Sequence, residues 1–351
     1  MSVFQSADFA DHEQVVHVAD TASGLRAIIA IHSTARGPAL GGCRIYPYPD
    51  EVAALRDVLR LSEGMSLKAA VADVPFGGAK MVVIADPRQK TPAMMRAVGA
   101  AVARLGGRYI TGEDVGTNAD DMAEIACETD CVMGLPERLG GSGDPSPSTA
   151  RGCFVGIRTA VRHRFGRDDL DGLRVAVQGL GNVGTNLCRM LHEAGARLLV
   201  TDTRIGAIES VVRGFGATAV APEEICAADA DVFAPCALGA VINDATLPRL
   251  KAAIVAGAAN NQLAGEARHG AGLRARNILY APDYVINAGG LIQLALERGG
   301  SLDWAEIERR IEAIGGTLDQ IFMRADQAGT PTSVAARELA HARLNVHERA
   351  A

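Results

Sequence analysis

The amino-acid sequence predicts an α/β fold of two domains. The chain has 351 residues, 48% of them hydrophobic, which is enough for two separate cores. Residues 136–147 are rich in glycine, serine and proline, a composition typical of a linker. We therefore expect a first domain over 1–135, a second over 148–329, and a C-terminal helix at 330–351 that packs on the first domain.

Composition and charge narrow the class of protein. The formal net charge is −6 and no long basic run is present, which argues against a nucleic-acid partner. No apolar stretch approaches the roughly 18 residues of a membrane span, and the N-terminus does not resemble a signal peptide. The 7 cysteines are scattered and form no Cys-x-x-Cys pair. We expect reduced thiols, no metal site, no membrane attachment and a cytoplasmic location.

The first domain is predicted to mix strands and helices. An imperfect apolar alternation over 13–32, broken by a turn, indicates a β-hairpin. Asp50 has the side chain of an N-cap for an amphipathic helix over 51–63 that continues to Lys68. A strand at 81–85, a helix over 92–105, a strand from 109 and a helix over 118–129 follow.

Two lysines and one acid of this domain are candidates for chemistry. Lys68 and Lys80 both stand in apolar, glycine-rich surroundings. Burial of both would lower the pKa of at least one ammonium and make it a base near neutral pH; alternatively, both reach water from an edge. Asp114 ends a predicted strand, where ligands collect in α/β sheets. It is a candidate for proton transfer or a cap for the next helix, and Glu113 is its competitor.

Adjacent glycines mark the loop over 37–42. Gly41 and Gly42 allow the backbone to approach a neighbouring group closely. The same residues are equally compatible with an ordinary loop. The pattern alone does not separate these two interpretations.

The second domain begins with a unit typical of dinucleotide binding. A β-branched run over 174–178 predicts a buried strand, and Gly179, Gly181 and Gly184 follow it. In such a loop one glycine turns the chain tightly, one lets the backbone approach a pyrophosphate, and one packs helix against strand. The helix that opens at Asn182 would direct its N–H groups at the phosphates. Together these features predict a Rossmann-type, doubly wound domain.

An acid closes the next predicted strand. Asp202, after the apolar run over 197–201, can accept both ribose hydroxyls of NAD and repel the 2′-phosphate of NADP. Arg204 leaves room for NADP, because a guanidinium pairs well with a phosphate. We expect NAD as the cofactor.

Asparagines follow further strands of this domain. Asn260, Asn261 and Asn287 stand where they could hydrogen-bond a carboxamide or a ribose, although helix capping is the alternative for Asn287. The strands are expected at 231–236, 253–259 and 278–282, each ending in small or polar residues as a crevice at the strand ends requires. A long helix over 148–166 is expected to bridge the two domains, and helices over 302–328 and 334–346 are interpreted as structural.

Short glycine- and asparagine-rich motifs recur through the chain, at residues 37–42, 64–68, 77–80, 113–117, 144–147, 179–184, 234–239, 257–261 and 281–290. Together they resemble the Glu/Leu/Phe/Val amino-acid dehydrogenases, most strongly the leucine, valine and phenylalanine branch. The resemblance implies an N-terminal α/β substrate and oligomerisation domain, a Rossmann-type NAD-binding domain, and a cleft between them that closes to exclude water. It also implies a homo-oligomer, a dimer or larger.

The resemblance further implies a reaction and roles for particular residues. The reaction is reversible oxidative deamination of a hydrophobic L-amino acid to the 2-oxo acid and ammonia, with NAD as the oxidant. Lys68 would hold the substrate carboxylate, Lys80 would activate water, and Asp114 would exchange protons with the amino group. Gly41 and Gly42 would line the substrate cleft. The cofactor would contact Gly179, Leu180, Gly181, Asn182, Val183, Gly184, Asp202, Thr149, Asn260, Asn261 and Asn287.

The residues that correspond to the side-chain pocket are all apolar: Leu40, Met65, Met133, Leu291 and Leu294. A charged substrate such as glutamate would have no partner there. Leu291 is larger than expected opposite an aromatic ring, which favours a leucine or valine type of substrate, although Met133 is adaptable. Against this, the stretches 67–70 and 74–76 lean toward the phenylalanine-type enzymes.

Two other classes of protein compete with this interpretation. A catalytically inactive relative that binds NAD and an amino acid is disfavoured, because Lys68, Lys80 and Asp114 are all present. A 2-hydroxy-acid dehydrogenase would need a histidine with an acidic partner on the cofactor domain. We identify no such partner for the histidines at 163, 192 and 269.

Overall fold

The computed structural model describes residues 3–237, 239–298 and 303–348. They form two compact units, one of residues 3–144, 294–298 and 340–348, the other of residues 145–293 and 303–339. The chain passes between the units inside the stretch expected as a linker. Position 238 of the 234–239 motif, position 302 of an expected helix and positions 349–351 lie outside the described residues.

Two short segments belong to a different unit from the one we expected. Residues 294–298 were assigned to the second domain but group with the first unit. Hydrogen bonds explain the difference: the Arg298 guanidinium donates to the Asp130 carbonyl, and the Glu297 carboxylate accepts from the Ser142 hydroxyl and, at 3.1 Å, from its N–H. The last helix was expected to pack on the first domain, but its residues 332–339 group with the second unit. Only its end, from residue 340 to 348, groups with the first unit, where Arg343 donates to the carbonyls of Ala70 and Val71.

The first unit is built on a mixed six-stranded sheet. Its strands are β1 (Gln14–Asp20), β2 (Leu25–Ser33), β3 (Ala39–Leu40), β4 (Cys43–Tyr46), β5 (Gly77–Ile84) and β6 (Tyr109–Ile110). Their order is β1-β2-β5-β3-β6, with β4 pairing with β5. The first two form the antiparallel hairpin predicted from the sequence. Strand β5 is central and nearly all buried, so its lysine, Lys80, lies in the middle of the sheet.

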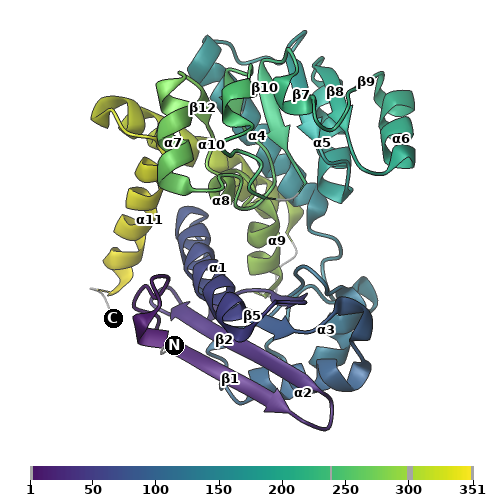
Figure 1. Ribbon diagram of the computed structural model, residues 1–351, viewed down its shortest axis with the longest axis vertical. Helices are drawn as coiled ribbons and strands as arrows, with labels where there is room; N and C mark the ends of the chain where they lie inside the picture. The colour runs from purple at the N-terminus through teal and green to yellow at the C-terminus, as the bar shows by residue number, and fades with distance from the viewer. Residues whose placement is uncertain (1–2, 238, 299–302, 349–351) are drawn as a thin grey trace. The chain divides into compact units, whose positions relative to one another are not determined.

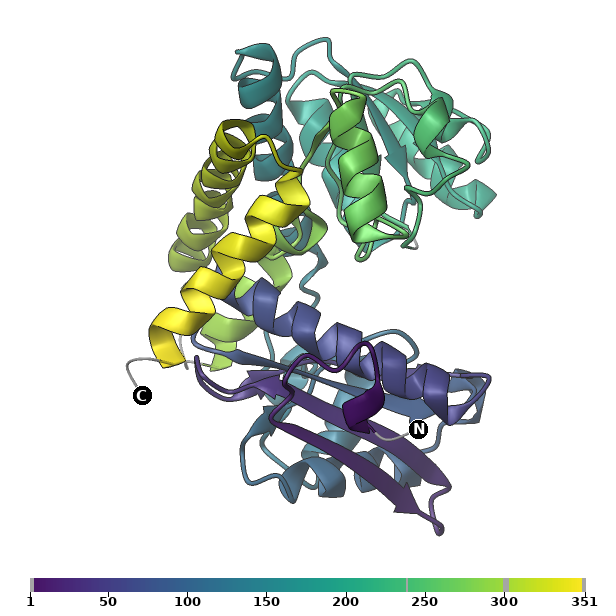
Figure 2. The same ribbon diagram turned by 60° about the vertical axis from the view of Figure 1, so that its left-hand side comes forward.

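Helices cover both faces of this sheet. Helix α1 (Glu51–Val71) packs on β2 and β5 on one side, and α2 (Pro92–Ala103) and α3 (Ala119–Ala126) lie on the other (Figures 1 and 2). The predicted caps are present, since the side chain of Asp50 accepts the N–H of Ala53, and Thr91 caps α2. Short 3-10 helices lie at Val3–Gln5, Pro87–Gln89 and Glu137–Leu139.

The second unit contains a parallel six-stranded sheet. The strands are β7 (Arg174–Gln178), β8 (Arg197–Thr201), β9 (Thr218–Ala219), β10 (Val232–Pro235), β11 (Ile254–Val255) and β12 (Leu279–Tyr280). Their order is β12-β11-β10-β7-β8-β9. The chain starts at the centre, adds strands on one side and then crosses to the other, which is the doubly wound Rossmann topology. Ligands of such sheets bind where the order reverses, here at the ends of β7 and β10.

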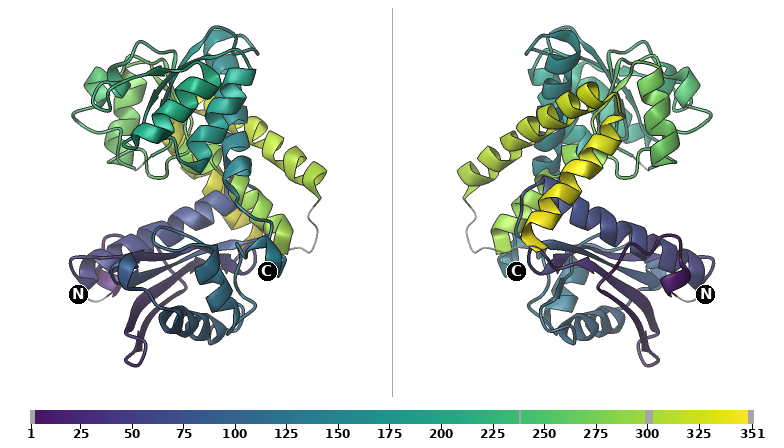
Figure 3. Two further views of the ribbon diagram at one scale, coloured as in Figure 1. Left: turned by 90° about the vertical axis from the view of Figure 1, so that its right-hand side faces the viewer. Right: turned by 90° about the vertical axis from the view of Figure 1, so that its left-hand side faces the viewer.

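The helices of this part of the chain are α4 (Ser146–Phe165), α5 (Asn182–Glu193), α6 (Ile205–Phe215), α7 (Glu266–Ala275), α8 (Asp283–Ile286), α9 (Gly289–Arg298), α10 (Trp304–Ala328) and α11 (Thr332–Glu348). Helix α4 packs against both α5 and α10 (Figure 3). Short 3-10 helices occur at Ile225–Ala227 and Leu247–Arg249. None of the helices in the described part of the chain is long and apolar enough to cross a membrane.

Candidate functional site

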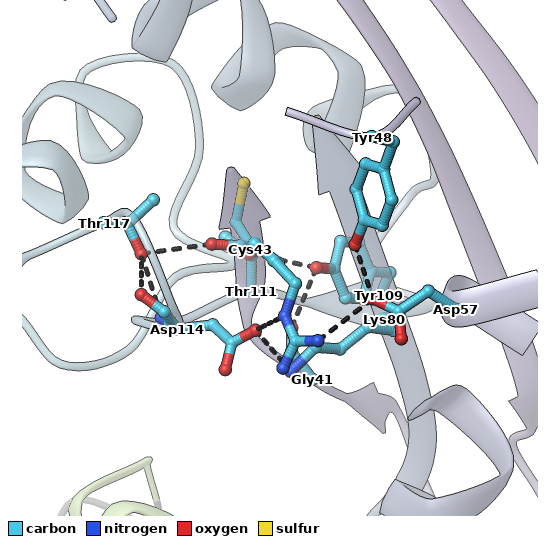
Figure 4. Close-up of polar contacts among 10 residues, drawn as sticks. Gly41, Cys43, Tyr48, Asp57, Lys80, Tyr109, Thr111, Asp114 and Thr117 are labelled. Carbon is cyan, nitrogen blue, oxygen red and sulfur yellow. Dashed lines mark hydrogen bonds and ion pairs between the residues drawn. The ribbon is translucent and has the colours of Figure 1, made fainter. Parts of the chain in front are cut away.

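Lys80 and Asp114 form an ion pair in the first unit. The Lys80 side chain is only 7% exposed, and its Nζ lies 3.0 Å from Asp114 Oδ2 (Figure 4). Asp114 follows β6, in a loop that the Thr117 hydroxyl ties to the carbonyl of Cys43 and to the N–H of Asp114. Asp114 therefore stands where a strand-end acid was expected, and a buried lysine faces it.

The environment keeps Asp114 ionised. Burial raises the pKa of this carboxyl, but Lys80 and Arg44, whose Nε lies 2.8 Å from Asp114 Oδ2, outweigh burial and lower the pKa below its usual value. Glu113, the competing acid, is exposed. Partial burial and the neighbouring Asp144 and Asp121 raise the pKa of Glu113. The structure thus brings Asp114, and not Glu113, to Lys80.

The glycine pair before β4 allows a close approach of three segments. A Cβ atom on Gly41 would lie 1.6 Å from the Ala79 carbonyl oxygen, and one on Gly42 would lie 2.5 Å from the Glu113 carbonyl oxygen. The Gly41 carbonyl accepts a hydrogen bond from the Tyr109 hydroxyl at 2.8 Å. Of the two interpretations left open by the sequence, the structure supports close backbone approach over an ordinary loop.

The other candidate residues of the first unit lie on several elements. Lys68 and Met65 are both half-buried and stand one turn apart on α1, hence on one face of that helix. Leu40 in β3 and Met133 are buried, and Leu294 in α9 is half-buried. Leu291, also in α9, is buried and belongs to the second unit.

The glycine loop of the second unit has the geometry that the sequence predicts. Gly179 follows β7 with φ of +97°, a left-handed conformation that favours glycine. A Cβ on Gly184 would lie 2.0 Å from the Gly179 carbonyl oxygen, so this glycine lets α5 pack against the loop. A Cβ on Gly181 would meet no heavy atom of the described residues within 4 Å. The tight turn, the close helix contact and the open backbone position are all present.

Asp202 lies beside this loop. One of its oxygens accepts the N–H of Leu180 at 2.7 Å, and the other accepts the N–H of Arg204 at 2.8 Å. Burial raises the pKa of Asp202, but hydrogen bonds from the Arg204 side chain and from these backbone N–H groups lower it to about 2. The carboxylate is therefore charged at neutral pH.

Asparagines meet at the ends of the strands. The Asn287 side-chain amide donates to the Ala258 carbonyl at 3.0 Å and to Asn260 Oδ1 at 2.7 Å, so this side chain links two loops, while the backbone N–H of Asn287 caps the C-terminus of α8. Its Oδ1 is buried and accepts no hydrogen bond from any described residue. Asn261 has φ of +52°. Thr149 donates to the Pro145 carbonyl one turn back in its own helix.

These observations fit a dinucleotide. The open position at Gly181, the N-terminus of α5, the charged Asp202 and the unsatisfied Asn287 Oδ1 all belong to the carboxyl ends of the parallel strands. That edge of a doubly wound sheet is where dinucleotides bind.

Sequence reasoning missed three residues and misjudged two histidines. It overlooked Arg44, Asp57 and Tyr48, although Arg44 directly follows the glycine pair and its cysteine. It also found no acidic partner for the histidines, and this was wrong for two of them, because His163 lies 3.0 Å from Asp326 and His269 lies 3.1 Å from Asp244. Such pairs join residues far apart in sequence. Both ring nitrogens of His269 are engaged, the second with Gly265.

Comparison with known proteins identifies the family. The protein-family model described as Glu/Leu/Phe/Val dehydrogenase, dimerisation domain, matches residues 12–130. A second family model, described as Glutamate/Leucine/Phenylalanine/Valine dehydrogenase, matches residues 140–211 and 202–345. The chain belongs to the Glu/Leu/Phe/Val dehydrogenase family. It is therefore an oxidoreductase, an amino-acid dehydrogenase, and this class of enzyme uses a nicotinamide cofactor.

Individual members of the Glu/Leu/Phe/Val dehydrogenase family are similar over nearly the whole chain. A leucine dehydrogenase of Bacillus cereus is 49% identical over 98% of this chain and 94% of its own length. A phenylalanine dehydrogenase of Caldalkalibacillus thermarum is 46% identical, covering 99% and 95%. The crystal structure of L-tryptophan dehydrogenase from Nostoc punctiforme superimposes with a TM-score of 0.84 at 48% identity, covering 96% of this chain and 97% of that one.

Proposed function

We propose that this enzyme catalyses the reversible, NAD-dependent oxidative deamination of a hydrophobic L-amino acid of the leucine or valine type. The products are the 2-oxo acid and ammonia. The observation that carries the proposal is the buried Lys80–Asp114 pair, because it places an amine and an ionised carboxylate side by side in a member of this family. Nucleophilic water and proton exchange at nitrogen both need such groups.

The roles of the first-unit residues follow from the bonds that change. A nicotinamide held by the second unit would supply the acceptor for the hydride that leaves the substrate α-carbon. The Asp114 carboxylate takes a proton from the substrate ammonium and later returns it to the departing nitrogen. Lys80 Nζ takes a proton from the water whose oxygen bonds to the imino carbon. Lys68 pairs with the substrate carboxylate, and the backbone at Gly41 and Gly42 lines the site.

NAD is the proposed cofactor rather than NADP. The residues that would hold it are the glycine loop over 179–184, Asp202, Thr149 and the asparagines Asn260, Asn261 and Asn287. The charged Asp202 would accept the ribose hydroxyls and repel a 2′-phosphate, which supports this choice. Arg204 donates to Asp202 and is thereby held by it.

The apolar residues that the resemblance assigns to the substrate side chain favour a hydrophobic substrate. The pocket is proposed to comprise Leu40, Met65, Met133, Leu291 and Leu294. None of these side chains can pair with a charged substrate group. An aromatic substrate is the second candidate, because enzymes named for tryptophan and phenylalanine are nearly as similar to this chain as those named for leucine. One or two methylenes change such selectivity by only about 1–3 kcal/mol.

We also propose a homo-oligomer, a dimer or larger. Support comes from the family model that matches the first unit, which is described as a dimerisation domain. Light scattering of the purified enzyme tests this directly.

The first experiment is an assay of NADH consumption with ammonia and a panel of 2-oxo acids. The panel contains 2-oxoisovalerate, 2-oxoisocaproate, phenylpyruvate, indolepyruvate and 2-oxoglutarate. Faster turnover of the branched acids supports the proposal, and preference for phenylpyruvate or indolepyruvate supports the aromatic candidate. Failure to turn over any of them would favour an inactive relative that binds NAD and an amino acid.

A further inference from the structure

Arg44 joins Asp114 to a second aspartate. Its Nε lies 2.8 Å from Asp114 Oδ2, and its Nη1 donates to Asp57 Oδ2 at 3.0 Å. The Tyr48 hydroxyl donates to the same Asp57 oxygen at 2.5 Å. Figure 4 labels the other members of this cluster, Asp114, Asp57, Tyr48 and Lys80, and marks the contacts that join them with dashed lines. The chain of contacts links β4, the loop after β6 and helix α1.

Both cations meet Asp114 through the same oxygen. Lys80 Nζ and Arg44 Nε both contact Oδ2, at 3.0 and 2.8 Å. Oδ1 takes part in no hydrogen bond or ion pair with any residue that the structure describes. The carboxylate is thus fixed by one oxygen and keeps the other for a group from outside the chain.

The charges of this cluster balance in a way that depends on Arg44. Lys80 and Arg44 supply two positive charges, and Asp114 and Asp57 supply two negative ones. A lysine that acts as a base passes through a neutral form, and its pairing with Asp114 is then lost. A guanidinium does not lose its proton, so Arg44 remains paired with the buried carboxylate throughout.

We propose that Arg44 is a positioning residue for the reaction, which holds Asp114 with Oδ1 turned toward the substrate nitrogen while Lys80 changes its protonation. Asp57 and Tyr48 hold Arg44 in turn. This inference rests on the proposed function of Lys80 and Asp114. It adds a residue that acts through Asp114 and does not itself touch the substrate.

A lysine at position 44 could not make both of the contacts that Arg44 makes. The two carboxylates are met by two different nitrogens of one planar group, whereas an ammonium is a single point charge on a flexible stem. Tyr48 remains a donor, because burial, followed by the hydrogen bond and charge of Asp57, raises its pKa. The Asp57 carboxylate is therefore held from two sides.

The titratable groups around the Asp114 carboxylate come from several elements. Lys80 on β5 and Arg44 on β4 lower its pKa, and Asp114 in turn helps to raise the pKa of Cys43 on β4 and of Tyr109 on β6. Burial raises the pKa of the thiol and of the phenol, so both are neutral at neutral pH. Removing the positive charge of Arg44 raises the pKa of Asp114, whose ionised form the proposed reaction needs. The acid limb of the pH–rate profile therefore moves to higher pH.

The test compares Arg44→Gln, Arg44→Lys and Asp57→Asn with the wild type in the direction of amino-acid oxidation. Arg36→Gln is the matched control, since Arg36 is equally an arginine paired with an aspartate, Asp73, in the same unit. We expect kcat of Arg44→Gln to fall by about 100-fold, as misplacement of a reacting group does. The apparent pKa of the acid limb in the pH profile of kcat/KM should increase by about one unit. KM for the amino acid and Kd for NADH should stay within a few-fold.

Arg44→Lys should restore the acid limb but only part of kcat, because it restores the charge and not the double contact. Asp57→Asn should lower kcat by about tenfold with a smaller change in the pH profile. If Arg44→Gln does not fold, Asp57→Asn and Arg44→Lys decide the question alone. Arg36→Gln should keep the wild-type kcat and pH profile.

Two results would overturn the inference. A raised KM for the amino acid with unchanged kcat would mean that Arg44 binds substrate directly. A wild-type kcat and acid limb in Arg44→Gln and Asp57→Asn would mean that the cluster is only structural. Failure of the proposed function can be distinguished from failure of this inference, because in the former case the wild-type enzyme itself would turn over none of the 2-oxo acids in the panel.

Discussion

Lys80 Nζ lies 3.0 Å from Asp114 Oδ2, in the interior of the first unit. The lysine comes from the central strand and the aspartate from a loop that the Thr117 hydroxyl holds in place. Neither group is buried alone, which explains how two ionisable side chains are tolerated in an apolar sheet. In the proposed reaction, the same contact lets an amine and a carboxylate act on one substrate molecule.

Replacement of Lys80 should separate chemistry from cofactor binding. We expect Lys80→Ala to abolish turnover, a loss of at least about 1,000-fold, because the proposed base is removed. The affinity for NADH, measured by fluorescence titration, should stay within a few-fold, since the residues proposed to bind the cofactor belong to the second unit. The exposed Lys251 provides a control, and Lys251→Ala should change neither quantity. Retention of most of the kcat in Lys80→Ala would show that another group is the base.

Replacement of Asp114 should reveal its charge through the pH dependence of stability. Asp114→Asn leaves Lys80 and Arg44 without their carboxylate, and we expect a loss of about 2–3 kcal/mol in the free energy of unfolding at neutral pH. The folded-state pKa of Asp114 is lowered, so its stabilisation is present above the unfolded pKa of about 3.9 and disappears as pH falls through the folded value.

Urea titrations at neutral pH and near pH 3 measure the difference in the free energy of unfolding between the wild type and Asp114→Asn. This difference should be smaller at the acidic pH. Asp120→Asn is the control, because the Asp120 carboxylate is 84% exposed in its pair with Arg138, and such pairs contribute little. A difference between wild type and Asp114→Asn that stays constant with pH would contradict an ionised Asp114.

Features set by local sequence were predictable, and those set by distant contacts were not. The hairpin, the caps Asp50 and Thr91 and the glycine loop each depend on a few neighbouring residues. The Arg44–Asp57 contact depends on how a strand packs beside α1, so no local pattern in the sequence predicts it. The order of the remaining strands is likewise a property of the whole sheet; the glycine loop predicted a doubly wound sheet but not which strands lie at its edges.

Two helices of the second unit also escaped prediction from the sequence. Helix α7 contains Gly270 and Gly272, which weaken a helical pattern. Packing explains Gly270, because a Cβ there would lie 2.7 Å from the Ser333 hydroxyl. Helix α6 begins with Ile205, which is 74% exposed, so its apolar residues do not all mark a buried face. Tertiary contacts, rather than local preference, account for both elements.

Replacement of two glycines of the glycine loop over 179–184 by alanine should have opposite effects on stability and on NADH binding. Gly181→Ala places its Cβ where no described heavy atom lies within 4 Å, with φ of −70°, so stability should not change. The same methyl group should weaken NADH binding by about tenfold if a pyrophosphate approaches there. Gly184→Ala would force a Cβ to within 2.0 Å of the Gly179 carbonyl and should cost about 1–3 kcal/mol of stability.

Thermal unfolding and NADH titration of both variants check this contrast. Gly316→Ala is the control, because Gly316 is an exposed glycine inside α10 with open space around it. It should stabilise the protein by about 0.5–1 kcal/mol and leave NADH binding unchanged. Unaltered NADH affinity in Gly181→Ala would argue that the cofactor does not pass this position.

Replacement of Asp202 should change the choice of cofactor. Asp202→Ala should raise KM for NAD by about tenfold and narrow the gap to NADP, since Arg204 is released toward a 2′-phosphate. Asp202→Asn keeps an acceptor for the Leu180 N–H but removes the charge, so it tests repulsion separately from loop structure. Because the pKa of Asp202 is about 2, the NAD preference of the wild type should be constant between about pH 5 and 9. An unchanged NAD-to-NADP ratio in both variants would remove Asp202 from the cofactor site.

Shortening the side chain of Leu291 should change which 2-oxo acid the enzyme prefers. Leu291 is buried, and Leu291→Val and Leu291→Ala remove one and three carbons from the proposed pocket. We expect kcat/KM for phenylpyruvate relative to 2-oxoisocaproate to rise stepwise, by up to about 100-fold in the alanine variant. The alanine variant should also lose about 2–5 kcal/mol of stability, so Leu273→Ala, a buried leucine of α7, serves as the control for destabilisation alone. Equal ratios in Leu291→Ala, Leu273→Ala and wild type would show that substrate size is decided elsewhere, with Met133 the next residue to test.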